Sequence, residues 1–236
     1  METITLENEN GIALLTLNRP EVLNSINTTL IAEVRAAVAK VAKNDDARVL
    51  VITGAGRGLC AGADLVIASH SASFVQVFGP RLGLIPDLGC TWHLPRLVGR
   101  ARALGLALTG DKLPAETAAE WGLIWKCVKD TALMEAVMTL ATKLAKGPAS
   151  AFAEIRKAID AGARNGYAEQ LDYERDVQGM LGDHPNFAEG VKAFLTKKEP
   201  AFKARSHRQN RTIFKTGRRI WNSSGSNSMS TAMWAC

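Results

Sequence analysis

The stretch VITGAGRGLCAGADLVIASHSASF, residues 51–74, decides which fold the sequence predicts. It begins inside the β-branched run RVLVIT, residues 48–53, which is typical of a strand buried on both faces of a helix-covered sheet. The small residues of GAGRGLCAGAD then let the backbone turn sharply and bring amide N–H groups near a ligand. A loop of this kind usually opens a helix, but VIASHSASF predicts a strand that leads into a turn. The junction of Leu65 and Val66 therefore raises the question whether an interior segment has been lost.

The residues before this stretch predict a hairpin and a helix. Runs at 3–7 and 12–17, joined by the turn residues NENG, are typical of a β-hairpin. Apolar residues recur at helix spacing over 27–42, with Asn27 or Thr28 as the N-cap. Strands and helices therefore alternate in the first part of the chain.

The residues after it change from alternating elements to helices alone. We expect a Gly/Pro-rich loop over 83–95, a helix over 96–108 stopped by Gly110, a helix from Pro114 to about Trp121, and a strand over 123–128. Four further helices are expected at 131–146, 149–164, 168–181 and 187–197. This order predicts an α/β fold in which a sheet is layered with helices, followed by a helical part. The expected divisions are a core over 1–130, a helical region over 131–205 and a tail over 206–236.

Composition limits the classes of protein. The chain has 236 residues and is 47% hydrophobic, which suits one globular domain, and no run of 18 apolar residues predicts a membrane span. The N-terminal METITLENENG lacks the features of a secretory or organelle signal. Four cysteines without CxxC pairing favour reduced thiols and no metal site. We therefore expect a cytoplasmic protein.

The positive charge is concentrated at the C-terminus. The net charge is +6, and five basic residues without an acidic one lie in 206–236. The near-neutral remainder gives no electrostatic reason to expect nucleic acid as a partner. The last residues are rich in Ser and Asn without apolar periodicity, and we interpret them as a disordered or non-native basic tail.

Four motifs in one order resemble the enoyl-CoA hydratase/isomerase (crotonase) superfamily. They are LNRPEVLNSI, VITGAGRGLCAGADL, GLIPDLGCTWHLPRLVGRARALGLALTGDKLPAETAAEWGLIWKCV and EGVKAFLTKKEPAFKAR, within residues 1–205. The forms GLIPD-G-TW and EWGLIW look most like the family's isomerase of phenylacetate breakdown, which converts ring-1,2-epoxyphenylacetyl-CoA to an oxepin-CoA. The resemblance implies a spiral of ββα turns with a C-terminal helical trimerisation region. It also implies an acyl-CoA thioester substrate, no metal, no cofactor beyond the coenzyme A of the substrate, and a homo-trimer or dimer of trimers.

The resemblance assigns residues to an oxyanion hole and to coenzyme A. Ala63 is expected to supply a backbone N–H to the thioester oxygen, because a donor there stabilises the charge that develops on it. Further residues are expected to contact coenzyme A: Ala61, Gly62, Asp64 and Leu65 in the same loop, Val22, Leu23 and Ser25 on the other side, and Phe202 and Lys203 toward a neighbouring subunit. Without the resemblance, a glycine-rich turn without a ligand explains the first group equally well, and a solvated helix end explains the last pair equally well.

Asp87 is the candidate acid or base. It lies among Leu84, Ile85, Pro86 and Leu88, and an apolar setting raises a carboxyl pKa toward a useful value. From the residues alone, an aspartate that closes a Pro-Asp turn is the better explanation. The resemblance favours catalysis, since isomerases of this type carry an aspartate at this position. FVQVFGPR carries no carboxylate where the family's hydratases have a glutamate, so water addition is disfavoured.

The resemblance also defines what the junction of Leu65 and Val66 lacks. In the family, roughly fifty to sixty residues lie here, including a helix, a buried strand and the second oxyanion donor. The loss of one such donor typically lowers a rate by about 100- to 1,000-fold. Two alternatives to a working isomerase therefore stay open. One is a truncated member that at most binds coenzyme A, and the other is a protein that interacts through its basic tail.

Overall fold

The computed structural model describes residues 1–22, 24–55, 65–87 and 89–203. The strands are β1 Ile4–Glu9, β2 Ile12–Leu17, β3 Val49–Gly54, β4 Ile67–Ser69, β5 Ser73–Phe74, β6 Leu113–Pro114 and β7 Lys126–Val128. The helices are α1 Thr28–Ala42, α2 Phe78–Leu82, α3 Cys90–Val98, α4 Arg100–Thr109, α5 Ala115–Glu120, α6 Leu133–Lys146, α7 Ala149–Gly162, α8 Tyr167–Gly182 and α9 Pro185–Thr196. Short 3-10 turns lie at Pro20–Val22 and Asp130–Ala132. The predicted order of strands and helices first, and helices alone afterwards, is confirmed.

The hairpin of β1 and β2 forms as predicted. The strands pair antiparallel, and Ile4 lies opposite Leu17. Between them, Asn10 and Gly11 have φ of 51° and 80°. A two-residue hairpin turn of this hand requires positive φ at both positions, and Asn followed by Gly adopts it at the lowest cost.

Helix α1 begins at the predicted cap and covers one face of the hairpin. The Asn27 side chain accepts a hydrogen bond from the Leu30 N–H at 2.8 Å, which satisfies one of the first amides of the helix. Leu30, Val34 and Ala37 are buried against the sheet. The 3.6-residue period of the sequence therefore gives the side of the helix that packs.

Strand β3 lies parallel beside β2 and is covered by a helix on each face. Leu50 and Ile52 pack with the cluster that α1 forms, whereas Val49 and Val51 pack with α6. The prediction of a helix-covered strand is confirmed. The sheet order, however, is β1-β2-β3, so β3 is an edge strand in the described part of the chain.

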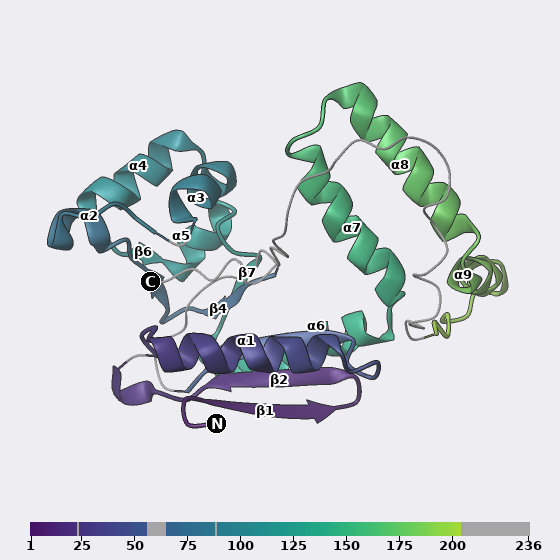
Figure 1. The fold of residues 1–236 in the computed structure, drawn as a ribbon, viewed down its shortest axis with the longest axis horizontal. Coiled ribbons are helices and arrows are strands. Elements are labelled where there is room, and N and C mark those ends of the chain that lie inside the picture. Colours follow the sequence, from purple (N-terminus) through teal and green to yellow (C-terminus); the bar gives the residue numbers. More distant parts are fainter. Residues whose placement is uncertain (23, 56–64, 88, 204–236) are drawn as a thin grey trace, which may run out of the picture.

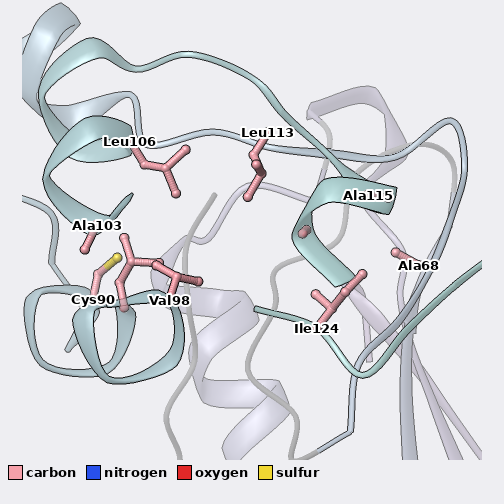
Figure 2. Packing of buried hydrophobic residues seen from close by; sticks show 10 residues of the cluster. Ala68, Cys90, Val98, Ala103, Leu106, Leu113, Ala115 and Ile124 are labelled. Atoms are coloured by element: carbon pink, nitrogen blue, oxygen red, sulfur yellow. The ribbon is translucent and has the colours of Figure 1, made fainter. Parts of the chain in front are cut away.

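A second core lies where α3, α4, α5 and β4 meet. Figure 2 shows Cys90 and Val98 facing Ala103 and Leu106 of α4. The prediction of a loop as far as residue 95 is wrong, because α3 already begins at Cys90. Burial of Cys90, Leu94 and Val98, spaced four residues apart, outweighs the helix-breaking tendency of Pro95.

The single helix predicted over 96–108 is also wrong. Gly99, with φ of 81° and ψ of 158°, separates α3 from α4. The predicted stop at Gly110 is confirmed, because Gly110 ends α4 in the left-handed conformation with φ of 65°.

Gly110 offers a test of this local packing. A Cβ at Gly110 would lie 2.5 Å from Pro80 Cγ, so Gly110→Ala adds a clash to the cost of positive φ. We expect it to lower the free energy of unfolding by about 2 kcal/mol in chemical denaturation. Gly105→Ala, within α4 and with no atom within 4 Å of the added Cβ, is the matched control and should raise it by about 0.5–1 kcal/mol. Equal effects of the two substitutions would contradict this packing.

The C-terminal helices form an arm beside the sheet layers. Figure 1 shows α7, α8 and α9 extending from α6, away from the cluster of α2 to α5. All four predicted helices are present, at α6 to α9. Large apolar side chains of the arm are exposed in the single chain: Ile155, Ile159, Tyr167, Leu171, Phe187, Phe194 and Leu195.

Glu33 on α1 holds the N-terminus and makes stability depend on pH. Its carboxylate accepts the Thr3 hydroxyl at 2.6 Å and the backbone N–H groups of Thr3 and Glu2 at 2.9 and 2.8 Å. These bonds, led by the Thr3 hydroxyl, lower the pKa of Glu33 from 4.5 to about 2. The unfolded chain therefore binds more protons at Glu33 between these values. The stabilising contribution is full above the unfolded pKa and is lost as pH falls toward about 2.

We accordingly expect the melting temperature to fall between pH 5 and pH 2.5, and to fall less steeply in Glu33→Gln. Glu7→Gln, an exposed position on β1, is the control and should keep the wild-type slope. Identical slopes for all three proteins would show that the hydrogen bonds from Glu2 and Thr3 to Glu33 contribute nothing to the pH dependence of stability.

Candidate functional site

Asn24 ties the loop between β2 and α1 to the end of β3. Its side chain is 2% exposed, accepts the Arg19 N–H at 2.7 Å and donates to the Ala55 carbonyl at 2.9 Å. Ala55 directly follows β3, and its own N–H donates to the Leu17 carbonyl at 2.7 Å. The loop is therefore fixed at the point where the glycine-rich stretch leaves the sheet.

Apart from Phe202 and Lys203, three residues of the predicted coenzyme A site lie among the described residues. Val22 and Ser25 lie in the fixed loop with exposed side chains, and Leu65, before β4, is 39% exposed. The predicted residues Leu23, Ala61, Gly62, Ala63 and Asp64 lie outside the described residues. The roles assigned to all eight stay predictions.

Sequence reasoning did not identify Asn24 as a site residue. The motif LNRPEVLNSI indicates only an ordered loop, although Asn24 has φ of 55°, a conformation that Asn tolerates better than most residues. Its hydrogen-bond partner at Ala55 is 31 residues away, so no local pattern could have shown the contact.

Asp87 lies in the loop that leads into α3. Its carbonyl accepts the Cys90 N–H at 2.8 Å, and Cys90 is buried in the core of Figure 2. The backbone at Asp87 is therefore attached to a packed helix. Its carboxylate has no hydrogen-bond partner among the described residues, which leaves it available to a ligand.

The apolar surroundings expected for Asp87 are not present in the single chain, where the loop is exposed to water. In the single chain Asp87 is exposed, Leu84 is 59% exposed and Ile85 is 78% exposed. Adjacent apolar residues in the sequence do not exclude water unless other elements cover them, and no described element covers this loop. The catalytic role of Asp87 stays a prediction, but burial within this chain does not support it.

Polar contacts fix the turn between β4 and β5. Asp130 accepts the Ser71 N–H at 3.0 Å, and hydrogen bonds from the hydroxyl and N–H of Ser71 lower the pKa of Asp130. His70 is exposed, and its Nε2 lies 3.5 Å from Glu116 Oε1. Burial raises the pKa of the Cys127 thiol on β7, so this cysteine stays protonated to higher pH.

Three tryptophans of this region differ in their surroundings. Trp121 packs against the core, with the Arg102 guanidinium 4.7 Å from its ring centre. Trp92 and Trp125 are instead exposed, and Arg96 lies 3.8 Å from the ring centre of Trp92.

Phe202 and Lys203 lie on the arm, far from the loop that holds Val22. Asn186 of α9 accepts the Lys203 N–H at 2.9 Å and donates to the Lys203 carbonyl at 3.3 Å. Phe202 lines an open cavity of about 450 Å³ between α7, α8 and α9. Figure 1 shows α9 at the opposite side of the molecule from the start of α1. One chain therefore does not bring the two predicted groups together.

Within the residues described, no three His, Cys, Asp or Glu side chains form a group that could hold a metal ion. None of the described helices is long and apolar enough to cross a membrane.

Comparison with known proteins decides the family. A profile of the enoyl-CoA hydratase/isomerase family matches residues 7–67 and 54–205. The 1,2-epoxyphenylacetyl-CoA isomerase of Escherichia coli is 39% identical over 259 residues, covering 86% of this chain and 98% of the relative. This chain belongs to the enoyl-CoA hydratase/isomerase family. A protein of Rhodobacter capsulatus assigned as an enoyl-CoA hydratase is 38% identical, again over 86% of this chain and 98% of the relative.

Solved structures agree with this membership. An enoyl-CoA hydratase/isomerase from Mycobacterium abscessus superimposes with a TM-score of 0.81 at 25% identity, covering 86% of this chain and 100% of that chain. An enoyl-CoA hydratase subunit from Geobacillus kaustophilus gives 0.79 at 28% identity, covering 85% and 98%. The chain therefore has the crotonase-type α/β fold of this family.

The alignment with the Escherichia coli relative is longer than the part of this chain that it covers. Since 86% of 236 residues is about 203, the 259-residue alignment contains about 56 positions for which this chain has no residue. The two profile matches share residues 54–67, so the interruption lies between the end of β3 and the start of β4. This range includes the junction of Leu65 and Val66.

Proposed function

We propose that this chain acts on an acyl-CoA thioester as an isomerase, with 1,2-epoxyphenylacetyl-CoA as its substrate. The observation that carries the proposal is the 39% identity to the Escherichia coli isomerase over nearly the whole of that relative. The reaction moves atoms within one molecule, so it needs no oxidant, no reductant and no cofactor beyond the coenzyme A of the substrate.

In this proposal, Asp87 moves the proton and the Ala63 N–H stabilises the thioester oxygen. One carboxylate that first accepts a proton and then returns it is enough for an isomerisation. The support for Asp87 is its fixed backbone at the start of α3 and its carboxylate, which has no hydrogen-bond partner among the described residues. Val22 and Ser25 would contact coenzyme A from the loop that Asn24 holds against β3.

A second candidate function is binding of the thioester without turnover. The open edge of β3 and the exposed loop of Asp87 favour it, because a reactive site must exclude water and hold its groups in a fixed geometry. Cytoplasmic location and a homo-trimer belong to both proposals. The exposed apolar side chains of the arm support the trimer.

Calorimetric titration with coenzyme A, followed by a turnover assay with 1,2-epoxyphenylacetyl-CoA, tests both functions. Binding together with formation of an isomeric CoA ester supports the isomerase. Binding without product supports the second candidate. If neither binding nor product is found, both proposals are wrong.

A further inference from the structure

The outer edge of β3 lies open between two helical layers. One edge pairs with β2, in a register from Ile12 opposite Val49 to Leu17 opposite Gly54. Over the described ranges, no strand pairs with the other edge. An edge strand of this kind presents a row of backbone N–H and C=O groups that can pair with another chain. Since α1 and α6 cover the two faces, only the edge is accessible.

Strand β4 has a matching free edge over the same helix. β4 pairs with β7 on one side, and nothing in the described chain pairs with its other side. Helix α6 contacts β2, β3 and β4, and the Arg48 guanidinium beside β3 donates to the Gly147 carbonyl at the end of α6. Neighbouring strands lie about 4.8 Å apart and a helix is about 10 Å wide. One helix, α6, can therefore cover both β3 and a further strand placed beside it.

Helix α6 also carries exposed methionines on the side that packs. Ala141 and Ala145, in its C-terminal half, are buried with Val51 of β3. Met134 and Met138 precede them at the spacing that keeps residues on one helix face, yet they are 45% and 36% exposed. The apolar stripe of α6 thus continues beyond the strand that covers it. Methionine adapts well to a variable apolar partner.

The relatives place additional residues at this point of the chain. The interruption in the family match lies between β3 and β4, and about 56 aligned positions have no residue here. Strands β3 and β4, which each have an open edge among the described residues, are therefore the strands that the additional segment connects in the relatives.

We propose that this chain binds an extended, apolar polypeptide segment, supplied by another molecule, along the outer edge of β3. The segment would add a strand through backbone hydrogen bonds, with apolar side chains on both faces because α1 and α6 lie on either side. Residues 49–54 carry no charge, which matches an apolar partner. A second whole copy fits this edge less well, since it would bring its own α1 and α6 against those of the first. This proposal does not depend on catalysis.

Fluorescence anisotropy with the full chain tests the proposal. The probe is a labelled peptide with the interior segment of the Escherichia coli isomerase that has no counterpart here, and its scrambled sequence is the control. We expect saturable binding of the probe but not of the scrambled peptide. Hydrogen exchange at residues 49–54 should slow when the probe is bound. Met134→Glu with Met138→Glu should weaken binding at least about tenfold, whereas Met180→Glu, at an exposed position on α8, should leave it unchanged.

Three results would overturn the proposal. The first is no saturable binding, and the second is equal binding of the scrambled peptide. The third is a dimer, detected by light scattering, that dissociates when both methionines of α6 are replaced, together with no binding of the probe. That result would assign the edge of β3 to a second copy of the chain. Circular dichroism of each variant separates loss of binding from loss of fold. If the double variant unfolds, the single variants Met134→Glu and Met138→Glu are tested in its place.

Discussion

Asp87→Asn is expected to lower the turnover of 1,2-epoxyphenylacetyl-CoA by about 100- to 10,000-fold, the range that a lost general acid or base typically costs. The amide keeps the size of the side chain but can no longer accept and return a proton. Because Asp87 is exposed and its carboxylate has no partner in the described chain, the fold should not change. Binding of coenzyme A should stay within about twofold, since only the proton transfer is removed. Steady-state kinetics and calorimetric titration check the two parts.

Asp111→Asn is the matched control. Asp111 is also exposed and lies in the loop between α4 and β6, so its substitution should leave turnover and binding unchanged. Wild-type turnover in Asp87→Asn would show that Asp87 has no part in the mechanism. The remaining explanation would be that Asp87 closes a Pro-Asp turn. Absence of turnover in the wild type, with coenzyme A bound, would instead favour the second candidate function.

Local features of the fold could be predicted because neighbouring residues determine them. The hairpin follows from the ability of Asn10 and Gly11 to take positive φ, and the start of α1 follows from Asn27 as a cap. The end of α4 follows from Gly110 in the same way. Where packing with distant residues decides, the prediction failed. Pro95 is tolerated within α3 because three of its neighbours are buried by α4 and β4.

The candidate site shows the same division. The sequence indicates Asp87 and its apolar neighbours, but their exposure depends on elements that would have to cover them, and a single sequence does not give these. Likewise the run RVLVIT predicts a strand covered by helices, which is confirmed, yet it cannot tell a central strand from an edge strand. The edge position arises from pairing with β2 alone, a contact between residues about 37 apart in the chain.

Asn24→Ala is expected to lower the free energy of unfolding by about 3 kcal/mol, because it removes two part-buried hydrogen bonds of a buried side chain and leaves the Arg19 N–H and the Ala55 carbonyl without these partners. Alanine also tolerates the φ of 55° at this position less well than asparagine. Chemical denaturation measures the loss. Asn18→Ala, an exposed position in the same loop, should change the free energy by less than about 0.5 kcal/mol.

Asn24→Asp separates the two hydrogen bonds, and with them the structural and functional roles of the loop. The aspartate keeps an acceptor for the Arg19 N–H but turns a carboxylate oxygen toward the Ala55 carbonyl, so the loop stays formed while its tie to β3 is lost. If the tie positions the coenzyme A site, Asn24→Asp should weaken binding of coenzyme A by about tenfold, even at temperatures where the variant is fully folded. Unchanged binding in a folded Asn24→Asp variant would show that Asn24 supports the fold alone, and that Val22 and Ser25 do not depend on β3 for their position.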